Sequence, residues 1–155
     1  MSPTYAAGTS VPVSRSRDEV EKILTRYGAD QFGFATSPSA AMIMFVVNGR
    51  QVRLVVPLPD RDGREFTRSE QNRARTAESA LRAWEQACRQ RWRALVLVVK
   101  AKLEAVEAGI VTFDQEFAMH MVLPDGSVVG DQVIPRIQLA YESGETPSLL
   151  PGPTS

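Results

Sequence analysis

Side chains that could act as nucleophiles or transfer protons are scarce in this chain of 155 residues. It has one histidine, His120, and one cysteine, Cys88, and it shows neither a P-loop nor a GxGxxG motif. A Ser-His-Asp triad and a zinc cluster are poorly supported by a single histidine, and a lone cysteine cannot form an internal disulfide. We therefore predict a protein that is not an enzyme, has no cofactor and holds no metal.

Four carboxylates in the C-terminal third are the other candidate metal ligands, and they are Asp114, Glu116, Asp125 and Asp131. Carboxylate oxygens bind divalent cations. However, the Pro124-Asp125-Gly126 turn accounts for Asp125, and no lysine stands at a nuclease-like spacing from the group. The sequence therefore assigns no metal ligand and does not favour a metal-dependent nuclease.

The basic residues form a more distinctive pattern. Fifteen of the 18 are arginine, whose planar guanidinium binds phosphate bidentately. The formal net charge is zero, but Arg50 to Lys102 holds 13 basic and 6 acidic residues, a net charge of +7, and the remainder carries −7. Because charges act locally, within a Debye length of about 8 Å, this segment predicts an anionic partner. A GC-rich genome would also enrich arginine, so a neutral explanation stays open.

A basic row with heptad spacing is the most specific candidate site. Arg68, Arg75, Arg82 and Arg89 recur every seven residues, and Arg93 and Lys100 continue the row along one face of an uninterrupted helix. Such a row could follow a nucleic-acid backbone through phosphate contacts. The predicted nucleic-acid-binding residues, including two from a neighbouring hairpin, are Arg50, Arg53, Arg75, Arg82, Arg89, Arg93 and Lys100.

A solvated, salt-bridged helix face is the alternative interpretation of the same row. Glu78 precedes Arg82 by four residues, and Glu85 precedes Arg89 by four. This is the favourable orientation for ion pairs within a helix. The basic row is therefore compatible with a binding surface and with an ordinary exposed face.

A long helix is needed to carry the row. No glycine or proline occurs between Thr67 and Gly109, and Thr67 with Glu70 predicts an N-terminal capping box. At 1.5 Å per residue such a helix would be on the order of 60 Å long, so we expect it to protrude, to pack on a second copy or to break near residues 76–79. Its apolar positions have the period of a helix packed on a sheet: Ala77, Leu81, Trp84, Cys88, Trp92, Leu95, Val99, Leu103 and Val106.

The stretch 94–99 within this helix is apolar on all sides, and its valines would also suit a strand. Its helical flanks favour helix. We predict that Trp84, Cys88 and Trp92 belong to the core.

A β-hairpin precedes the helix. Asn48-Gly49 between two β-rich runs predicts a type I′ turn, which pairs Val47 with Arg50 and fixes the register of both strands. One face of the hairpin is then core. The opposite face is too polar for a deep interior and too apolar for open solvent, so we expect it to be partly covered or to bind a partner. It presents Met42, Met44, Val46, Gln51, Arg53 and Val55, without the aromatic rings on which single-strand binders stack bases.

Shorter elements are predicted on both sides of these two. Ser16 and Glu19 form a capping box for a helix that ends at Gly28, and a strand follows around 32–34. Beyond Gly109, Thr112 and Gln115 cap a short helix. We then expect a strand through His120 to residue 123, a possible return strand at 127–129, and a last helix that has Pro135 in its first turn and ends at Gly144.

The predicted fold is α+β, with an antiparallel β-hairpin or small sheet packed against one long helix and short N- and C-terminal helices. We expect a single domain over residues 14–144, a flexible arm at 1–13 and a flexible tail at 145–155. No run approaches the roughly 18 apolar residues of a membrane span, and the N-terminus lacks the apolar region of a signal peptide. The sequence therefore predicts no membrane contact and a cytoplasmic location.

Two strings, WEQACRQRWRALVLVVKAKLEAVEAG at 84–109 and VLPDGSVVG at 122–130, resemble small phage and prophage proteins of no known function. The likeness extends over residues 13–151. It implies a protein that acts in the host cytoplasm on nucleic acid or on a host protein.

Two functional hypotheses follow. The leading one is a non-enzymatic accessory protein that binds single-stranded or duplex nucleic acid without sequence preference. The alternative is a protein-interaction module, an adaptor or inhibitor of a host factor, that uses the long helix or the Met-rich hairpin face. A homodimer is a further expectation, because so long a helix leaves apolar surface that a second copy could cover.

Overall fold

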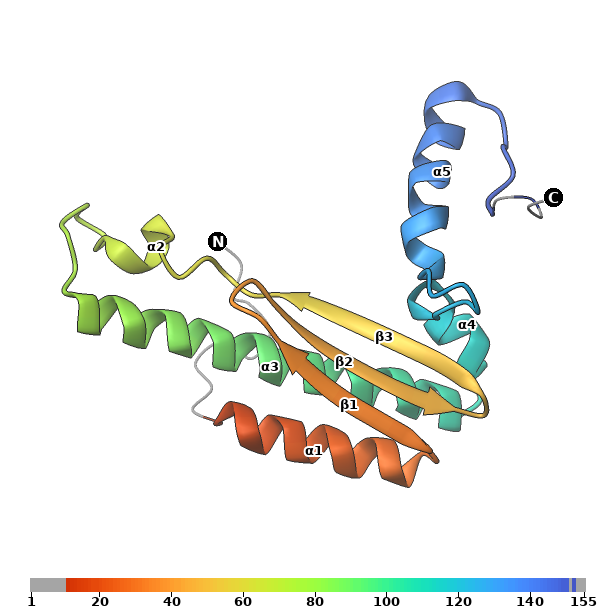
Figure 1. Cartoon of the computed structure of the whole chain (residues 1–155), viewed down its shortest axis with the longest axis horizontal. Coiled ribbons are helices and arrows are strands. Elements are labelled where there is room, and N and C mark those ends of the chain that lie inside the picture. Colours follow the sequence, from red (N-terminus) through yellow and green to blue (C-terminus); the bar gives the residue numbers. More distant parts are fainter. Residues whose placement is uncertain (1–10, 151, 153–155) are drawn as a thin grey trace.

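A computed structural model describes residues 11–150 and 152 of the chain and confirms the predicted α+β fold class. Figure 1 shows a small sheet, two helices that run along it, and a C-terminal helix that stands away from both. The elements are α1 (Val13–Arg26), β1 (Gln31–Thr36), β2 (Ala40–Val47), β3 (Arg50–Pro57), α2 (Arg64–Thr67), α3 (Ala77–Glu107), α4 (Phe113–Phe117), the 3₁₀ helix η1 (Ala118–His120) and α5 (Val129–Ser143).

The sheet is antiparallel in the order β1-β2-β3. Asn48 and Gly49 adopt φ values of 50° and 75°, as a type I′ turn requires, and β2 and β3 pair in the predicted register from Val47↔Arg50 to Ala41↔Val56. β1 continues the sheet on the other side of β2, with Phe34 opposite Ile43. This register places alternate side chains of β2 in the core.

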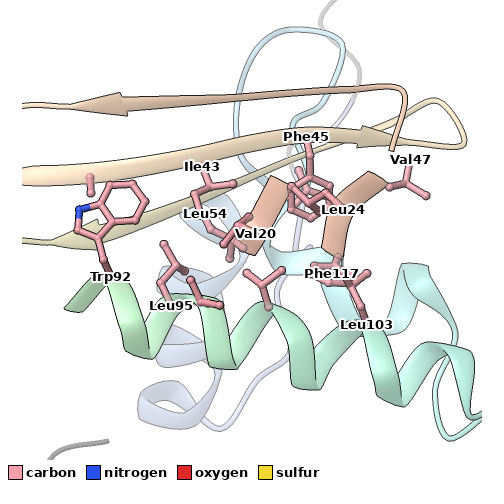
Figure 2. Packing of buried hydrophobic residues seen from close by; sticks show 14 residues of the cluster. Val20, Leu24, Ile43, Phe45, Val47, Leu54, Trp92, Leu95, Leu103 and Phe117 are labelled. Atoms are coloured by element: carbon pink, nitrogen blue, oxygen red, sulfur yellow. The ribbon is translucent and has the colours of Figure 1, made fainter. Parts of the chain in front are cut away.

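The core lies between one face of the sheet and the two helices α1 and α3 (Figure 2). Ile43 and Phe45 of β2 are fully buried, as are Val20 and Leu24 of α1. α4 closes one end, where the ring centroids of Phe117 and Phe45 lie 5.7 Å apart. α3 contributes its own buried row, which includes Cys88, Trp92, Leu95, Val99 and Leu103, as its sequence period predicts.

The first helix begins earlier than predicted. Pro12 is the N-cap residue of α1, and its carbonyl accepts the N–H of Ser16 at 3.2 Å. Ser16 is buried inside the helix, so the predicted capping box with Glu19 is wrong. The end at Gly28, with a φ of 88°, is as predicted. Most of the predicted flexible arm lies outside the described residues, and Val13 belongs to α1.

The long helix begins at Ala77 and not at Thr67. Thr76 is its N-cap, because the Thr76 hydroxyl accepts the N–H of Ser79 at 3.1 Å. Thr67 instead ends α2, and its carbonyl accepts the N–H of Arg75 at 2.9 Å across the intervening loop. The start predicted at Thr67 is therefore wrong, and the break near residues 76–79 is confirmed. From there to Glu107 the helix is continuous, including the apolar stretch 94–99.

The C-terminal third departs most from prediction. The capping box of Thr112 and Gln115 is present at α4. The expected strand to residue 123 is replaced by η1, which contains His120, and by isolated bridges at Met121 and Val122. The return strand is reduced to a single bridge at Val128.

The last helix, α5, begins at Val129, so Pro135 lies inside it and not in its first turn. The end at Gly144, with a φ of 76°, is as predicted. Among the residues described here, no helix is both long enough and apolar enough to cross a membrane.

Two valines of β3 test whether one face of the sheet carries the stability. Val52 is fully buried and Val55 is 57% exposed on the opposite face. We expect Val52→Ala to lower the free energy of unfolding by about 2 kcal/mol. Val55→Ala should change it by less than about 0.5 kcal/mol. Urea denaturation of the two variants measures both, and equal losses would contradict a core confined to one face.

Candidate functional site

The predicted basic residues do not share one surface. Arg68 and Arg75 lie in the loop before α3, because that helix begins only at Ala77. Arg50 and Arg53 lie on β3. The continuous row of six on one helix is therefore wrong, and four of its members remain on α3: Arg82, Arg89, Arg93 and Lys100.

These four residues lie on the flank of α3 that is turned toward α1. The guanidinium of Arg93 forms an ion pair with the carboxylate of Glu19 on α1, and both side chains are partly buried, at 23% and 36% exposure. Arg89 donates from Nε and Nη2 to Oε1 of Gln86, at 2.9 and 2.6 Å, and not to the predicted partner Glu85. Arg93 therefore stabilises the packing of two helices and is not free to bind an external phosphate.

Three of the remaining predicted cations, Arg50, Arg82 and Lys100, are exposed. Arg82 pairs with Glu78 at 3.7 Å, as predicted, and Arg50 pairs with Asp114 at 3.5 Å. Lys100 is exposed and forms no ion pair with another described residue. On the α1-facing flank of α3, Arg82 and Lys100 are thus the cations most accessible to a ligand.

The acidic group of the C-terminal third is dispersed in the same way. Glu116 pairs with Lys102 at 2.9 Å, and Asp114 pairs with Arg50. Asp125 accepts hydrogen bonds from the backbone and hydroxyl of Ser127, which lower the pKa of its carboxyl. Across residues 11–150, no three His, Cys, Asp or Glu side chains are grouped to hold a metal ion.

Trp92 and Cys88 lie in the core, as predicted, and burial raises the pKa of the Cys88 thiol. Trp84 is half-buried. Its Nε1 donates to the carbonyl of Pro59 at 2.8 Å, and the guanidinium of Arg61 lies 5.6 Å from its ring centroid. These contacts tie the loop after β3 to α3, a structural role for the tryptophan.

The outward face of the sheet is covered by neither α1 nor α3. α1 and α3 both lie on the opposite side, and the alternating burial along β2 marks the difference between the two faces. Gln51 Nε2 lies 2.7 Å from Met44 Sδ on this surface, and Val55 is 57% exposed. We call it the open face, and it consists of Gln31, Gly33, Ala35, Met42, Met44, Val46, Gln51, Arg53 and Val55.

Arg53 is the one charged side chain of the open face. Its Nε is buried and has no hydrogen-bond partner among the described residues. Leaving a buried donor unsatisfied costs about 1–3 kcal/mol. The open face therefore combines apolar side chains with one cation, whose Nε has no hydrogen-bond partner among the described residues.

A notch of about 300 Å³ joins the open face to the base of α5. Burial, and then the nearby Lys102, lower the pKa of the His120 imidazole. The notch is lined by Arg53, Val55, Met119, His120, Val128, Gly130, Asp131 and Ile134.

Gly130 fixes the position at which α5 leaves the notch. A Cβ at this residue would lie 2.5 Å from the backbone oxygen of Met119, closer than side-chain carbons approach. The N–H of Val129 also donates to the carbonyl of Met121, at 3.0 Å. The base of α5 is therefore held firmly against η1.

An exposed apolar row runs from the notch along α5. Ile134, Ile137 and Tyr141 are spaced i, i+3, i+7 and are 58%, 38% and 88% exposed. We call these three residues the α5 stripe. Their spacing in the sequence indicates a helix, but the spacing does not reveal whether another element packs against these residues.

No protein-family model, curated protein or solved structure matches the chain. The resemblance to phage and prophage proteins stays a prediction.

The ion pair between Glu19 and Arg93 gives a test of the arrangement around α3. We expect a double-mutant cycle with Glu19→Ala and Arg93→Ala to give a coupling energy of about 1 kcal/mol, because both groups are partly shielded from water. The matched cycle at Glu78 and Arg82, which are 81% and 70% exposed, should give less than about 0.5 kcal/mol. Chemical denaturation supplies both values, and equal couplings would argue that Arg93 is free in solution.

Proposed function

We propose that this protein is a non-enzymatic protein-interaction module whose open face receives an acidic, amphipathic helix of a partner protein. The observation that carries the proposal is the open face itself, an apolar sheet surface with a single cation, Arg53.

A helix is the occupant that suits the shape of this surface. A sheet with two apolar faces is ordinarily covered on both, and α1 and α3 cover one face. β2 and β3 have eight residues each, which gives a surface about 26 Å long. That length accommodates about five turns of helix, a common size for a helix bound through its apolar row.

The charge of the open face argues for an acidic helix. Arg53 is the one cation of the open face, and a carboxylate of the partner would accept hydrogen bonds from its guanidinium. Such charge-assisted hydrogen bonds are about twice as strong as neutral ones. Arg53 would thereby set the orientation of the bound helix, while Met42, Met44 and Val46 supply apolar contact.

A synthetic acidic peptide, designed as an amphipathic helix with leucines at i, i+3, i+4 and i+7, tests this proposal. We expect it to bind the intact protein, as measured by fluorescence anisotropy. Val55→Lys should weaken binding at least about tenfold, because it places a charge within the apolar contact.

Ile110→Lys is the matched control, since Ile110 is also an exposed apolar residue, at 76%, but lies outside the open face. A scrambled peptide of the same composition controls for charge alone. Equal binding of both peptides, or equal loss in both variants, would show that the open face is not the docking surface.

Binding of nucleic acid is the second candidate function, and the exposed side chains of Arg82 and Lys100 on one flank of α3 favour it. The other predicted cations are dispersed over several elements, so the structure supports nucleic-acid binding less strongly than the sequence does. If it is correct, affinity for an oligonucleotide should fall with salt, with a log–log slope of about −0.7 to −0.9 for each phosphate contacted.

Charge reversal tests this second candidate directly. Arg82→Glu together with Lys100→Glu should remove most of the oligonucleotide binding, whereas Arg136→Glu on α5 should preserve it. Filter binding at low salt measures both variants. Unchanged binding in the double variant would rule out the α3 flank as the site.

A further inference from the structure

We infer that the helix bound on the open face is α5 of a second copy, so that the protein forms a dimer in which each chain places its α5 on the sheet of the other. This inference rests on the proposed function, because it names the partner of the same surface.

Within one chain, most of α5 has no element packed against its apolar row. Its main packing neighbour is η1 at its base, and the α5 stripe beyond that base is exposed. Pro135 cannot donate the helical hydrogen bond to the carbonyl of Asp131. An isolated helix of about 15 residues is marginal in water, so this one needs a surface against which to bury its apolar row.

The open face of the same chain is not that surface. The contact of Gly130 with Met119, and the hydrogen bond from Val129 to Met121, fix the direction in which α5 leaves the notch. Figure 1 shows that this direction carries the helix away from the sheet. Ile134 lines the notch beside Val55, and the rest of the stripe extends beyond the chain's own body.

The two surfaces agree in length and in charge. α5 has 15 residues and is about 22 Å long, against about 26 Å for the strands of the open face. Residues 129–150 contain Asp131, Glu142 and Glu145 and one cation, Arg136, whose Nη1 already donates to the carbonyl of Ser148 at 2.6 Å. Asp131 lies in the notch beside Arg53 of its own chain, so Glu142, near the end of α5, and Glu145, just after it, are the acidic groups that would meet Arg53 of the second copy.

A reciprocal arrangement also gives enough contact for stable association. One helix of this length on one sheet face buries less than the roughly 800 Å² per partner of a typical stable interface. A two-fold axis repeats the contact, because each chain then contributes both its α5 and its open face. The doubled contact is what makes a second copy a better occupant than a single peptide segment.

Two single variants and their mixture test the dimer. Ile137→Lys disrupts the α5 stripe and Val55→Lys disrupts the open face, and both positions are exposed, so the fold should survive. Sedimentation velocity of the full chain should show a dimer for the wild type and at least about a tenfold weaker dimer for each variant. A mixture of the two variants should give a dimer that is tighter than that of either variant alone and weaker than that of the wild type, because one of the two contacts in the mixed pair joins an intact α5 to an intact open face.

Leu139→Lys is the matched control on α5. Leu139 is 56% exposed but lies roughly opposite the stripe, so this variant should dimerise as the wild type does. Circular dichroism confirms that each variant is folded. A wild-type monomer over the micromolar range would overturn the inference, and so would a mixture whose dimer is no tighter than that of either variant alone, because that outcome indicates contact between identical surfaces.

The same measurements separate this inference from the proposed function. A monomeric protein that binds the designed helical peptide would retain the proposed function and reject the second copy as the partner. A monomer that binds no helical peptide would reject both.

Discussion

Burial of one face of a three-stranded sheet beneath two helices is the constraint on which the rest of the structure depends. Val20 and Leu24 of α1 and the buried row of α3 meet the same side of β2, and the interior is closed by Phe117. This arrangement buries one apolar face of the sheet and leaves the other face without a covering helix from α1 or α3. The open face, and the notch beside it, follow from that imbalance.

The same constraint decides what the charged residues do. Because α1 lies beside α3, part of the Arg-bearing flank of α3 meets a helix, and Arg93 pairs there with Glu19, a residue 74 positions away in the chain. Spacing along a single helix indicates which side chains share a flank. It cannot indicate which other helix lies against that flank, so the basic row in the sequence suggests a larger free surface than the fold provides.

Local signals with a direct steric cause predicted the fold well. Asn48-Gly49 determined the turn and therefore the register of β2 and β3, and with it the residues of the open face that these strands supply. Thr112 with Gln115, and the glycines at the ends of α1 and α5, marked real helix termini. The capping boxes at Ser16 and Thr67 failed, because burial of Ser16 and the loop before Thr76 outweighed a short sequence pattern.

The sequence predicted only part of the candidate site. Alternation along the hairpin identified a face of intermediate polarity, including Arg53. It could not show that α1 and α3 both lie on the other side, because the side of a sheet on which a helix packs depends on the path of the intervening loops. The exposure of Tyr141 likewise depends on where η1 directs the following chain, which no pattern within α5 records.

Pro135 weakens the connection between the base of α5 and its outer half, compared with a regular helix of the same length. With the backbone bond to Asp131 missing, the turns after residue 135 are joined to the base by fewer hydrogen bonds than those of an uninterrupted helix. The base is clamped by the close approach of Gly130 to Met119, so bending concentrates at a single joint. The outer half of α5 is therefore the part of the helix whose angle to the core is least constrained by backbone hydrogen bonds.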